Sequence, residues 1–465
     1  MEQGWSVVFQ ILLLGVMLGL GIVIKLNVKF LQKHLIPTSM IAGFIGLGVN
    51  IIGEYVFDYV IFDRNFLSQV IYHLMGIGFI SMALKERKKK QSKSIFNTGF
   101  AIINTYAWQA IVGFGLSLIL VNTFFPDLFP LSGMLLPLSF AQGPGQANNI
   151  GMTWEQYGFT DGGNVGLTLA TLGFLWAFFG GIPLINYLTK KRTHEKNKFD
   201  ARKTEVTSID SESQVEHTIN VPKSIYVDDF TVQVALIGVI YAVTYGLLLL
   251  LDYLVSPLGS FGKTLTDLFW GFNFLFGTLL AILSKKILNK LKDKKVISVN
   301  YADNYLLQKI SSGSFDLMIT AGIAAISISV LYDYLVPVLI ISTVGGLFTM
   351  VYTVFIAKRI YDDEIIENIA CLYGMWTGTI TTGIALLREV DPTAKTSAAD
   401  NAVLGSGFAA AFAVPIMLIL NVPVQGYLQN KPWLYALTFI LLLAYSAIMI
   451  ACIAFINKKY KKNKD

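Results

Sequence analysis

Long apolar runs separated by short polar or charged segments dominate the chain. A helix needs roughly 20 apolar residues to cross ~30 Å of hydrocarbon, and eleven runs of about that length can be marked. These expected crossings span residues 5–24, 37–57, 67–84, 97–121, 163–188, 231–251, 267–284, 314–331, 335–357, 401–422 and 432–456. The pattern therefore predicts an all-α polytopic membrane protein.

Two further apolar stretches, 134–150 and 366–387, are interrupted by Gly, Pro, Thr or Asn. Cationic loops stay on the cytoplasmic side of a membrane, and orientation alternates at each true crossing. If both stretches enter and leave on one side, the cytoplasmic segments hold all 36 lysines and arginines except Arg64, Lys263 and Lys431. The charge pattern thus favours two re-entrant hairpins, with the N-terminus outside and the C-terminus in the cytoplasm.

The composition agrees with a membrane protein and argues against other classes. Hydrophobic residues make up 54% of the chain and charged residues 14%, so much of the apolar surface has to face lipid. The net charge of +6 comes from cations in loops between apolar runs, which is not the pattern of a nucleic-acid-binding surface. Two cysteines and four scattered histidines form neither a disulfide framework nor a transition-metal site.

Each half of the chain shows the same order of four crossings, a broken hairpin, a polar connection and a fifth crossing. Because five is odd, two such repeats lie in the membrane in opposite orientations, and their hairpin tips face each other. The expected organisation is a first repeat (1–189, hairpin near 133–160), a cytoplasmic linker (190–230) and a second repeat (231–424, hairpin near 366–390). An extra helix and a basic tail follow (425–465).

The two hairpins carry the candidate substrate and ion ligands, because non-helical backbone at membrane depth is tolerated only where it is buried in protein or lines a wet cavity. The candidates in the first hairpin are Gln142, Gly143, Gly145, Gln146, Asn148 and Asn149, and those in the second are Thr377, Gly378, Thr379, Thr381 and Thr382. Their neutral amide, hydroxyl and carbonyl oxygens favour Na⁺ over H⁺ as the coupling ion.

Polar residues also stand where the last helix of each half begins. Asp161 and Asn164 precede one, and Asp400 and Asn401 precede the other. They are candidate site residues, because helix starts beside broken segments suit a carboxylate-bearing substrate; helix capping is the alternative interpretation. Asp316 is either a helix cap or an ion-pathway carboxylate. The Gly- and Ala-rich stretch 405–411 predicts close helix packing.

Several segments resemble bacterial sodium/glutamate symporters of the glutamate:sodium symporter (ESS) family. They are the loop 25–37 followed by Ala42 and Gly43, the stretches 157–160 and 170–173, and the two Gly-rich hairpins, within a likeness that covers about 5–423. The resemblance implies a ten-helix inverted-repeat core, re-entrant loops meeting near the midplane, a scaffold, a moving transport part, and coupled uptake of Na⁺ and an acidic amino acid. The eleventh helix lies outside that plan.

We therefore expect a secondary transporter in the cytoplasmic (inner or plasma) membrane of a bacterium, performing sodium-coupled symport of glutamate or a related small carboxylate by elevator-like alternating access. A carrier of 2-hydroxycarboxylates or other organic anions, or an ion channel, is the alternative. No cofactor besides Na⁺ is expected. We expect a homodimer, because moving one part against a fixed scaffold commonly requires one. No HExxH, GxSxG or intramembrane Asp pair indicates an enzyme.

Overall fold

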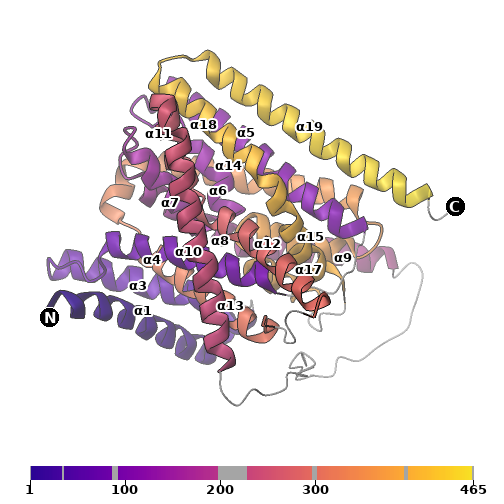
Figure 1. The fold of residues 1–465 in the computed structure, drawn as a ribbon, viewed down its shortest axis with the longest axis horizontal. Coiled ribbons are helices and arrows are strands. Elements are labelled where there is room, and N and C mark those ends of the chain that lie inside the picture. The colour runs from indigo at the N-terminus through magenta and orange to yellow at the C-terminus, as the bar shows by residue number, and fades with distance from the viewer. Residues whose placement is uncertain are drawn as a thin grey trace.

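The computed structural model describes residues 2–33, 36–85, 93–196, 228–295, 301–391 and 396–462. Within these ranges the chain is helical and contains no strand. Helices α1 and α19 lie at opposite edges of the view in Figure 1. Most of the expected linker, 190–230, lies outside the described residues, as does most of the basic run that follows Leu84.

Short helices interrupt the long ones in both parts of the chain. The first part contains α1 (Glu2–Asn27), α2 (Lys29–Lys33), α3 (Thr38–Val56), α4 (Arg64–Leu84), α5 (Lys93–Thr123), η1 (Ser132–Met134), α6 (Leu135–Phe140), α7 (Pro144–Glu155), α8 (Gly162–Phe179) and α9 (Gly181–Lys196). The second contains α10 (Asp229–Val255), η2 (Ser256–Leu258), α11 (Gly259–Gly271), α12 (Asn273–Asp293), α13 (Asn304–Ala324), α14 (Ile328–Ile360), α15 (Ile365–Trp376), α16 (Ile380–Leu387), α17 (Ala398–Ala409), η3 (Ala410–Phe412), α18 (Ala413–Leu428) and α19 (Trp433–Lys462).

Ten of the eleven expected crossings correspond to candidate spans in the structure. Nine helices of the described residues are long and apolar enough to cross a membrane, and the number is ten when the bent pair α11 and α12 is taken as one broken span. The expected crossing at 314–331 is the exception. Its helix, α13, has 21 residues but carries Gln308, Lys309, Asp316 and several serines, and is not among the candidate spans.

Two expectations for the second half were wrong in detail. The crossing expected at 267–284 is not one straight helix, because α11 ends at Gly271, α12 begins at Asn273, and the two axes are bent by 64°. The boundary expected between 331 and 335 lies earlier, since α13 ends at Ala324 and α14 begins at Ile328. Apolar side chains continue through this turn, so run length could not locate it.

One group of helices, which we call the framework bundle, contains α1, α3, α4 and α10–α13. Helix α4 packs against α12 and α13, and α3 packs against α13 and α1. Helices α4 and α13 approach closely at Gly78 of α4, where a Cβ atom would lie 3.0 Å from the Phe315 ring. The Ser311 hydroxyl donates a hydrogen bond to the Gly78 carbonyl at 3.0 Å, which ties α13 to α4.

The second group, which we call the hairpin bundle, contains α5–α9 and α14–α18. Helix α5 packs against α14, α17 and α6, while α8 packs against α6, α7 and α14. Gln109 on α5 is fully buried, and its Nε2 donates to Thr349 Oγ1 on α14 and to the Trp376 carbonyl of α15, both at 2.9 Å. These bonds join α5 to α14 and to the C-terminal end of α15.

The extra C-terminal helix, α19, lies along α5 and α18. Two polar contacts fasten it to α5: Asn97 Nδ2 donates to Asn457 Oδ1 at 2.8 Å, and Ser446 Oγ donates to Asn104 Oδ1 at 2.6 Å. Helix α19 is therefore attached to the hairpin bundle, as Figure 1 also shows by its position beside α5 and α18.

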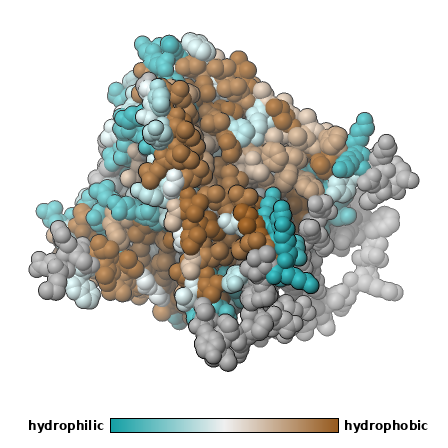
Figure 2. All heavy atoms as spheres, in the orientation of Figure 1, coloured by the Kyte–Doolittle hydropathy of each residue, from teal (hydrophilic) through white to brown (hydrophobic). Residues whose placement is uncertain are grey.

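Exposed apolar side chains cover the outer helices. Val239 and Tyr253 on α10 are 62% and 77% exposed, and α1 and α19 expose similar side chains. In Figure 2 hydrophobic residues cover the centre of the visible face, and hydrophilic residues gather toward its edges. Lipid is the solvent that such a surface requires.

Candidate functional site

The first hairpin consists of α6 and α7, with a break at residues 141–143. Gly143 has φ 89° and ψ −175°, a backbone conformation open essentially to glycine alone. Pro144 follows as the first residue of α7, where its missing N–H costs no helical hydrogen bond. The break therefore falls where the Gly143-Pro144 pair predicts it.

The second hairpin consists of α15 and α16, with a break at residues 377–379. The Thr377 hydroxyl donates to the Tyr373 carbonyl at 2.7 Å and so satisfies the end of α15. Thr379 caps α16, since its hydroxyl accepts a hydrogen bond from the Thr382 N–H at 3.4 Å and lies 3.2 Å from the Thr382 hydroxyl. Three of the predicted threonines thus stabilise the break itself.

The two breaks meet. A Cβ atom built on Gly143 would lie 3.1 Å from Thr379 Cγ2 and 3.9 Å from the Gly378 carbonyl oxygen. The structure therefore brings together the two hairpin tips that the sequence predicts to face each other.

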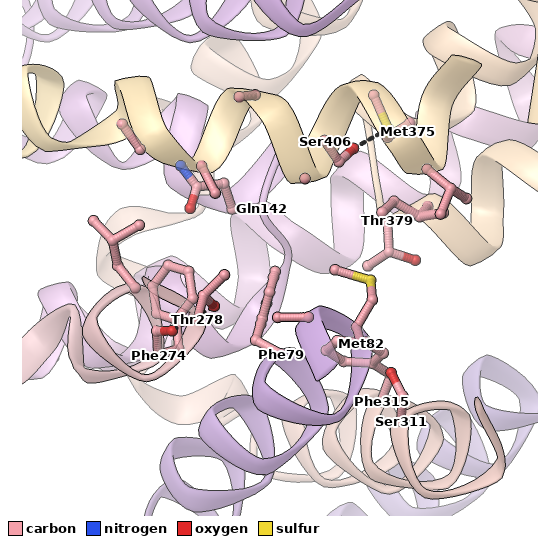
Figure 3. A pocket seen from close by; sticks show the side chains of 18 of the residues that line it. Phe79, Met82, Gln142, Phe274, Thr278, Ser311, Phe315, Met375, Thr379 and Ser406 are labelled. Atoms are coloured by element: carbon pink, nitrogen blue, oxygen red, sulfur yellow. Dashed lines mark hydrogen bonds between the residues drawn. The ribbon is translucent and has the colours of Figure 1, made fainter. Parts of the chain in front are cut away.

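A cavity of about 250 Å³ opens beside the tips, between the hairpin bundle and the framework bundle. The hairpins contribute Gln142, Thr379 and Thr381, and α17 contributes Ser406. In Figure 3 Gln142, Thr379 and Ser406 lie on one side of the cavity, opposite Phe79 and Phe315. A small ligand placed there would contact the amide and hydroxyl groups of these three residues, and Thr278 and Ser311 add hydroxyl groups on the side of Phe79 and Phe315.

The opposite wall is aromatic. Phe79 of α4 packs against Phe274 of α12, with ring centroids 4.8 Å apart, and edge-to-face against Phe315 of α13 at 5.3 Å. All three side chains line the cavity and come from the framework bundle. The three rings offer no strong hydrogen bonds, and the polar groups on this side come from Thr278 of α12 and from Gln308, Ser311 and Ser312 of α13.

Two lysines lie at one end of the cavity. Lys285 Nζ on α12 donates to the Ala83 and Lys85 carbonyls at 2.8 and 3.0 Å, which satisfies the C-terminal end of α4. Lys85 Nζ is hydrogen-bonded to Gln308 Oε1 of α13. The cavity thus runs from the neutral hairpin tips to a cationic end formed by α4, α12 and α13.

The remaining hairpin-1 candidates lie on α7, outside the residues that line this cavity. Gly145 allows close contact with the framework bundle, because a Cβ there would lie 2.7 Å from Met75 Sδ. Asn148 Oδ1 accepts a hydrogen bond from Ser68 of α4 at 3.3 Å, and Asn149 Nδ2 donates to the Gly271 carbonyl at 3.5 Å. Gln146 is fully buried. Asn148 and Asn149 thus contact the framework bundle.

The helix-start residues are neither side-chain caps nor part of the cavity. Asp161 is the N-cap residue of α8 but makes no side-chain capping hydrogen bond, and Asp400 lies inside α17, whose N-cap is Ser397. Asn164 instead binds Ser327 twice, accepting from its N–H at 2.8 Å and donating to its carbonyl at 3.1 Å. Asn401 Nδ2 donates to Asn368 Oδ1 of α15 at 3.1 Å. Both asparagines hold neighbouring segments together, which excludes the capping interpretation.

Asp316 is not a helix cap either. It lies in the middle of α13, whose N-cap is Asp303, which accepts a hydrogen bond from the Leu306 N–H at 2.9 Å. One turn further on, Thr320 donates to the Ser39 carbonyl at 3.1 Å, so this part of α13 packs against α3. Asp316 does not line the cavity at the hairpin tips.

Sequence reasoning missed the aromatic wall and Ser406. Phenylalanines inside apolar runs give no signal that separates cavity-lining from lipid-facing positions. The stretch 405–411 was expected only to pack closely, and Gly405 does so, since a Cβ there would lie 2.7 Å from Thr98 Cγ2. Its neighbours Ser406 and Gly407, however, line the cavity.

Comparison with protein families decides the class. A family model described as sodium/glutamate symporter matches residues 5–390. This chain belongs to the sodium/glutamate symporter family. The resemblance found in the sequence is thereby confirmed, and the chain is a multi-pass, sodium-coupled membrane transporter. Comparison with curated proteins and with solved structures gave no match.

The matched part of this sodium/glutamate symporter contains both hairpins, the aromatic wall and the cationic end of the cavity. Ser406, on α17, and the whole of α19 follow it. The family is one of transporters, so its members give no ground for assigning an enzymatic activity to this chain.

Proposed function

We propose that this symporter couples Na⁺ to the uptake of glutamate or a related small carboxylate across the bacterial cytoplasmic membrane. The observation that carries the proposal is the meeting of the two hairpin breaks, at Gly143 and Thr379, beside a cavity between two helix bundles. A site located between two bundles is accessible from alternate sides when one bundle moves against the other.

We propose further that residues 1–189 and 231–424 are inverted repeats, each with a re-entrant hairpin. The packing of the helices supports this division. The contact between α3 and α13 corresponds to the contact between α12 and α4. The contact between α5 and α17 likewise corresponds to the contact between α14 and α8. The contacts of α5 with α6 and of α1 with α13 correspond to those of α14 with α15 and of α10 with α4.

In this proposal the hairpin bundle is the moving part and the framework bundle, paired with a second copy in a homodimer, is the fixed part. The aromatic wall of Phe79, Phe274 and Phe315 supports such an elevator-like motion, because apolar side chains make no directional bonds that sliding would break. Gln142, Thr379, Thr381 and Ser406 belong to the hairpin bundle and would move with the substrate, while Thr278 and Ser311 would stay with the framework bundle.

The substrate is proposed to bind at Gln142, Thr379, Thr381 and Ser406. Their amide and hydroxyl groups can donate hydrogen bonds to a carboxylate, and the N-terminal end of α16 adds partial positive charge. Lys85 and Lys285 at the other end of the cavity attract anions. A 2-hydroxycarboxylate could accept hydrogen bonds from the same groups, so 2-hydroxycarboxylates are the alternative substrate class.

Uptake into proteoliposomes tests the proposal. We expect an inward Na⁺ gradient to drive accumulation of radiolabelled glutamate, and unlabelled glutamate inside the vesicles to accelerate its entry. Competition by unlabelled dicarboxylates and 2-hydroxy acids then ranks their affinities. Sodium-driven uptake of a 2-hydroxy acid without any of glutamate would transfer the assignment to that class. A steady ionic conductance with no exchange would identify a channel and contradict the carrier.

Thr381→Ala is expected to weaken substrate binding. The side chain lines the cavity at the start of α16, and losing one hydrogen bond to an ionised group costs about 1.5–3 kcal/mol, or roughly tenfold or more in apparent affinity. Initial uptake rates over a range of substrate concentrations measure it. The control is Thr123→Ala, an exposed hydroxyl at the end of α5. Equal effects of both substitutions would contradict a role for Thr381 in the site.

The orientation proposed from the charge pattern places the cationic end of the cavity in the cytoplasm. Ser312→Cys, introduced where Ser312 lines the cavity and with Cys371 and Cys452 replaced, should then react with a membrane-impermeant maleimide only in inside-out vesicles. Gln156→Cys, an exposed position at the end of α7, should react only in right-side-out vesicles. The reverse pattern would invert the proposed topology.

A further inference from the structure

The break between α11 and α12 faces α7 of the first hairpin, outside the cavity described above. Gly271, the last residue of α11, permits close approach, since a Cβ there would lie 2.7 Å from Ile150 Cδ1 and 3.6 Å from Thr153 Oγ1. Asn149 Nδ2 reaches the Gly271 carbonyl at 3.5 Å, at the long limit of a hydrogen bond. The carbonyl at this helix end is therefore only weakly satisfied.

Buried amide groups without partners lie on the same face of α7. Gln146 is fully buried, and neither its Oε1 nor its Nε2 has a hydrogen-bond partner among the described residues. Asn149 is 5% exposed, and its Oδ1 also lacks a partner. Residues three apart on a helix share a face, so Gln146 lies one turn from Asn149 on this face, nearer the hairpin tip.

A third such oxygen belongs to the break itself. Asn273, the first residue of α12, is 2% exposed. Its Nδ2 donates to the Tyr241 hydroxyl at 3.3 Å, and its Oδ1 has no partner in the part of the chain that the structure describes. Buried polar groups in native proteins are otherwise nearly always paired. Several unpaired amide oxygens at one helix break indicate a ligand that accepts electron pairs.

The electrostatics of the break favour a cation. The C-terminal end of α11 carries partial negative charge, and Asp267 lies one turn before Gly271 on the same face of that helix. Asp267 also contacts the hairpin connection, since it accepts a hydrogen bond from the Tyr157 hydroxyl at 2.5 Å. A carboxylate and a helix C-terminus thus lie beside neutral oxygens, the set of groups with which broken membrane helices bind Na⁺.

We propose that Gln146 Oε1, Asn149 Oδ1 and the Gly271 carbonyl bind a sodium ion between α7 and α11. The inference rests on the proposed sodium coupling and assigns the amide face of α7 to the ion, while the cavity at the hairpin tips holds the substrate. Because α7 belongs to the hairpin bundle and α11 to the framework bundle, an ion bound here stabilises the present arrangement of the two bundles. Sodium would then bias the conformational equilibrium as well as the binding of substrate.

Thermal unfolding of the purified protein, in NaCl and in KCl of equal ionic strength, tests the site without any transport measurement. We expect Na⁺ to raise the Tm of the natural sequence and the Gln146→Leu variant to lose this increment, with half-saturation shifted about tenfold or more. In KCl the same variant should be at least as stable as the natural sequence, because an unpaired buried amide has been replaced by an apolar side chain.

Gln156→Leu serves as the control, because Gln156 lies exposed at the end of the same helix and should leave the Na⁺ increment unchanged. Binding of radioactive sodium to the same three proteins gives a second readout. A Gln146→Leu protein that keeps the full increment, or one destabilised equally in both salts, would overturn the site while leaving sodium coupling intact. If Na⁺ did not raise the Tm of the natural sequence, the proposed sodium site would also be overturned. Measurement of Na⁺-driven uptake would then test sodium coupling separately.

Discussion

Gly143→Ala should reduce sodium-driven uptake about tenfold or more while the protein still folds. At φ 89° and ψ −175° a side chain costs about 1–3 kcal/mol, and a Cβ there would lie 3.1 Å from Thr379 Cγ2 in the opposing hairpin. The added methyl group forces the two tips apart at the place where the substrate is proposed to bind. Initial uptake rates, normalised to the monodisperse protein recovered, measure the effect.

The control for this substitution is Gly238→Ala in α10, where a Cβ would meet nothing within 4 Å. Alanine is the better helix former there, so uptake should match that of the natural sequence. If Gly143→Ala transported as well as Gly238→Ala, the meeting of the tips would have no role in transport.

Gly113→Val is expected to have the largest effect on stability. A Cβ on Gly113 of α5 would lie 2.1 Å from the Gly133 carbonyl oxygen, a backbone atom of η1 at the start of the first hairpin. Neither partner has a flexible side chain that could move aside, so the hairpin has to leave α5, at a cost of about 3 kcal/mol. Size-exclusion chromatography after a series of heating steps gives the change in apparent Tm.

Gly115→Val, two residues further along α5, is the matched control, because the nearest atom to its Cβ would be Phe439 Cζ at 3.9 Å. Its effect on stability should stay within about 0.5 kcal/mol. Similar losses in both variants would show that any β-branched side chain destabilises α5, and would exclude a specific role for its contact with η1.

The length of apolar runs predicted most of the helices because crossing hydrocarbon imposes a minimum length. The prediction at 97–121 falls inside α5 (Lys93–Thr123), since polar residues continue a helix beyond the apolar part of a run. The same criterion failed at the α11–α12 break. An apolar run continues across Phe272, and only Gly271 and Asn273 beside it mark a possible interruption.

The two hairpin breaks were predictable because glycine, proline and threonine act locally on the backbone. Gly143 supplies a positive φ, and Thr379 caps the helix that follows it, without any need for distant partners. The roles of Asn164 and Asn401 depend on residues far away in sequence, Ser327 and Asn368, which no local pattern could identify. For the same reason the aromatic wall was not foreseen.

The polar attachment of α19 has a consequence for shortened forms of the chain. Removing everything from Trp433 onward would leave Asn97 without its Asn457 partner and Asn104 without Ser446. In hydrocarbon, which offers no replacement hydrogen bonds, newly uncovered amides favour association with any helix that can pair with them. A truncated protein would therefore tend to self-associate through α5, and its loss of activity would not by itself show that α19 contributes to transport.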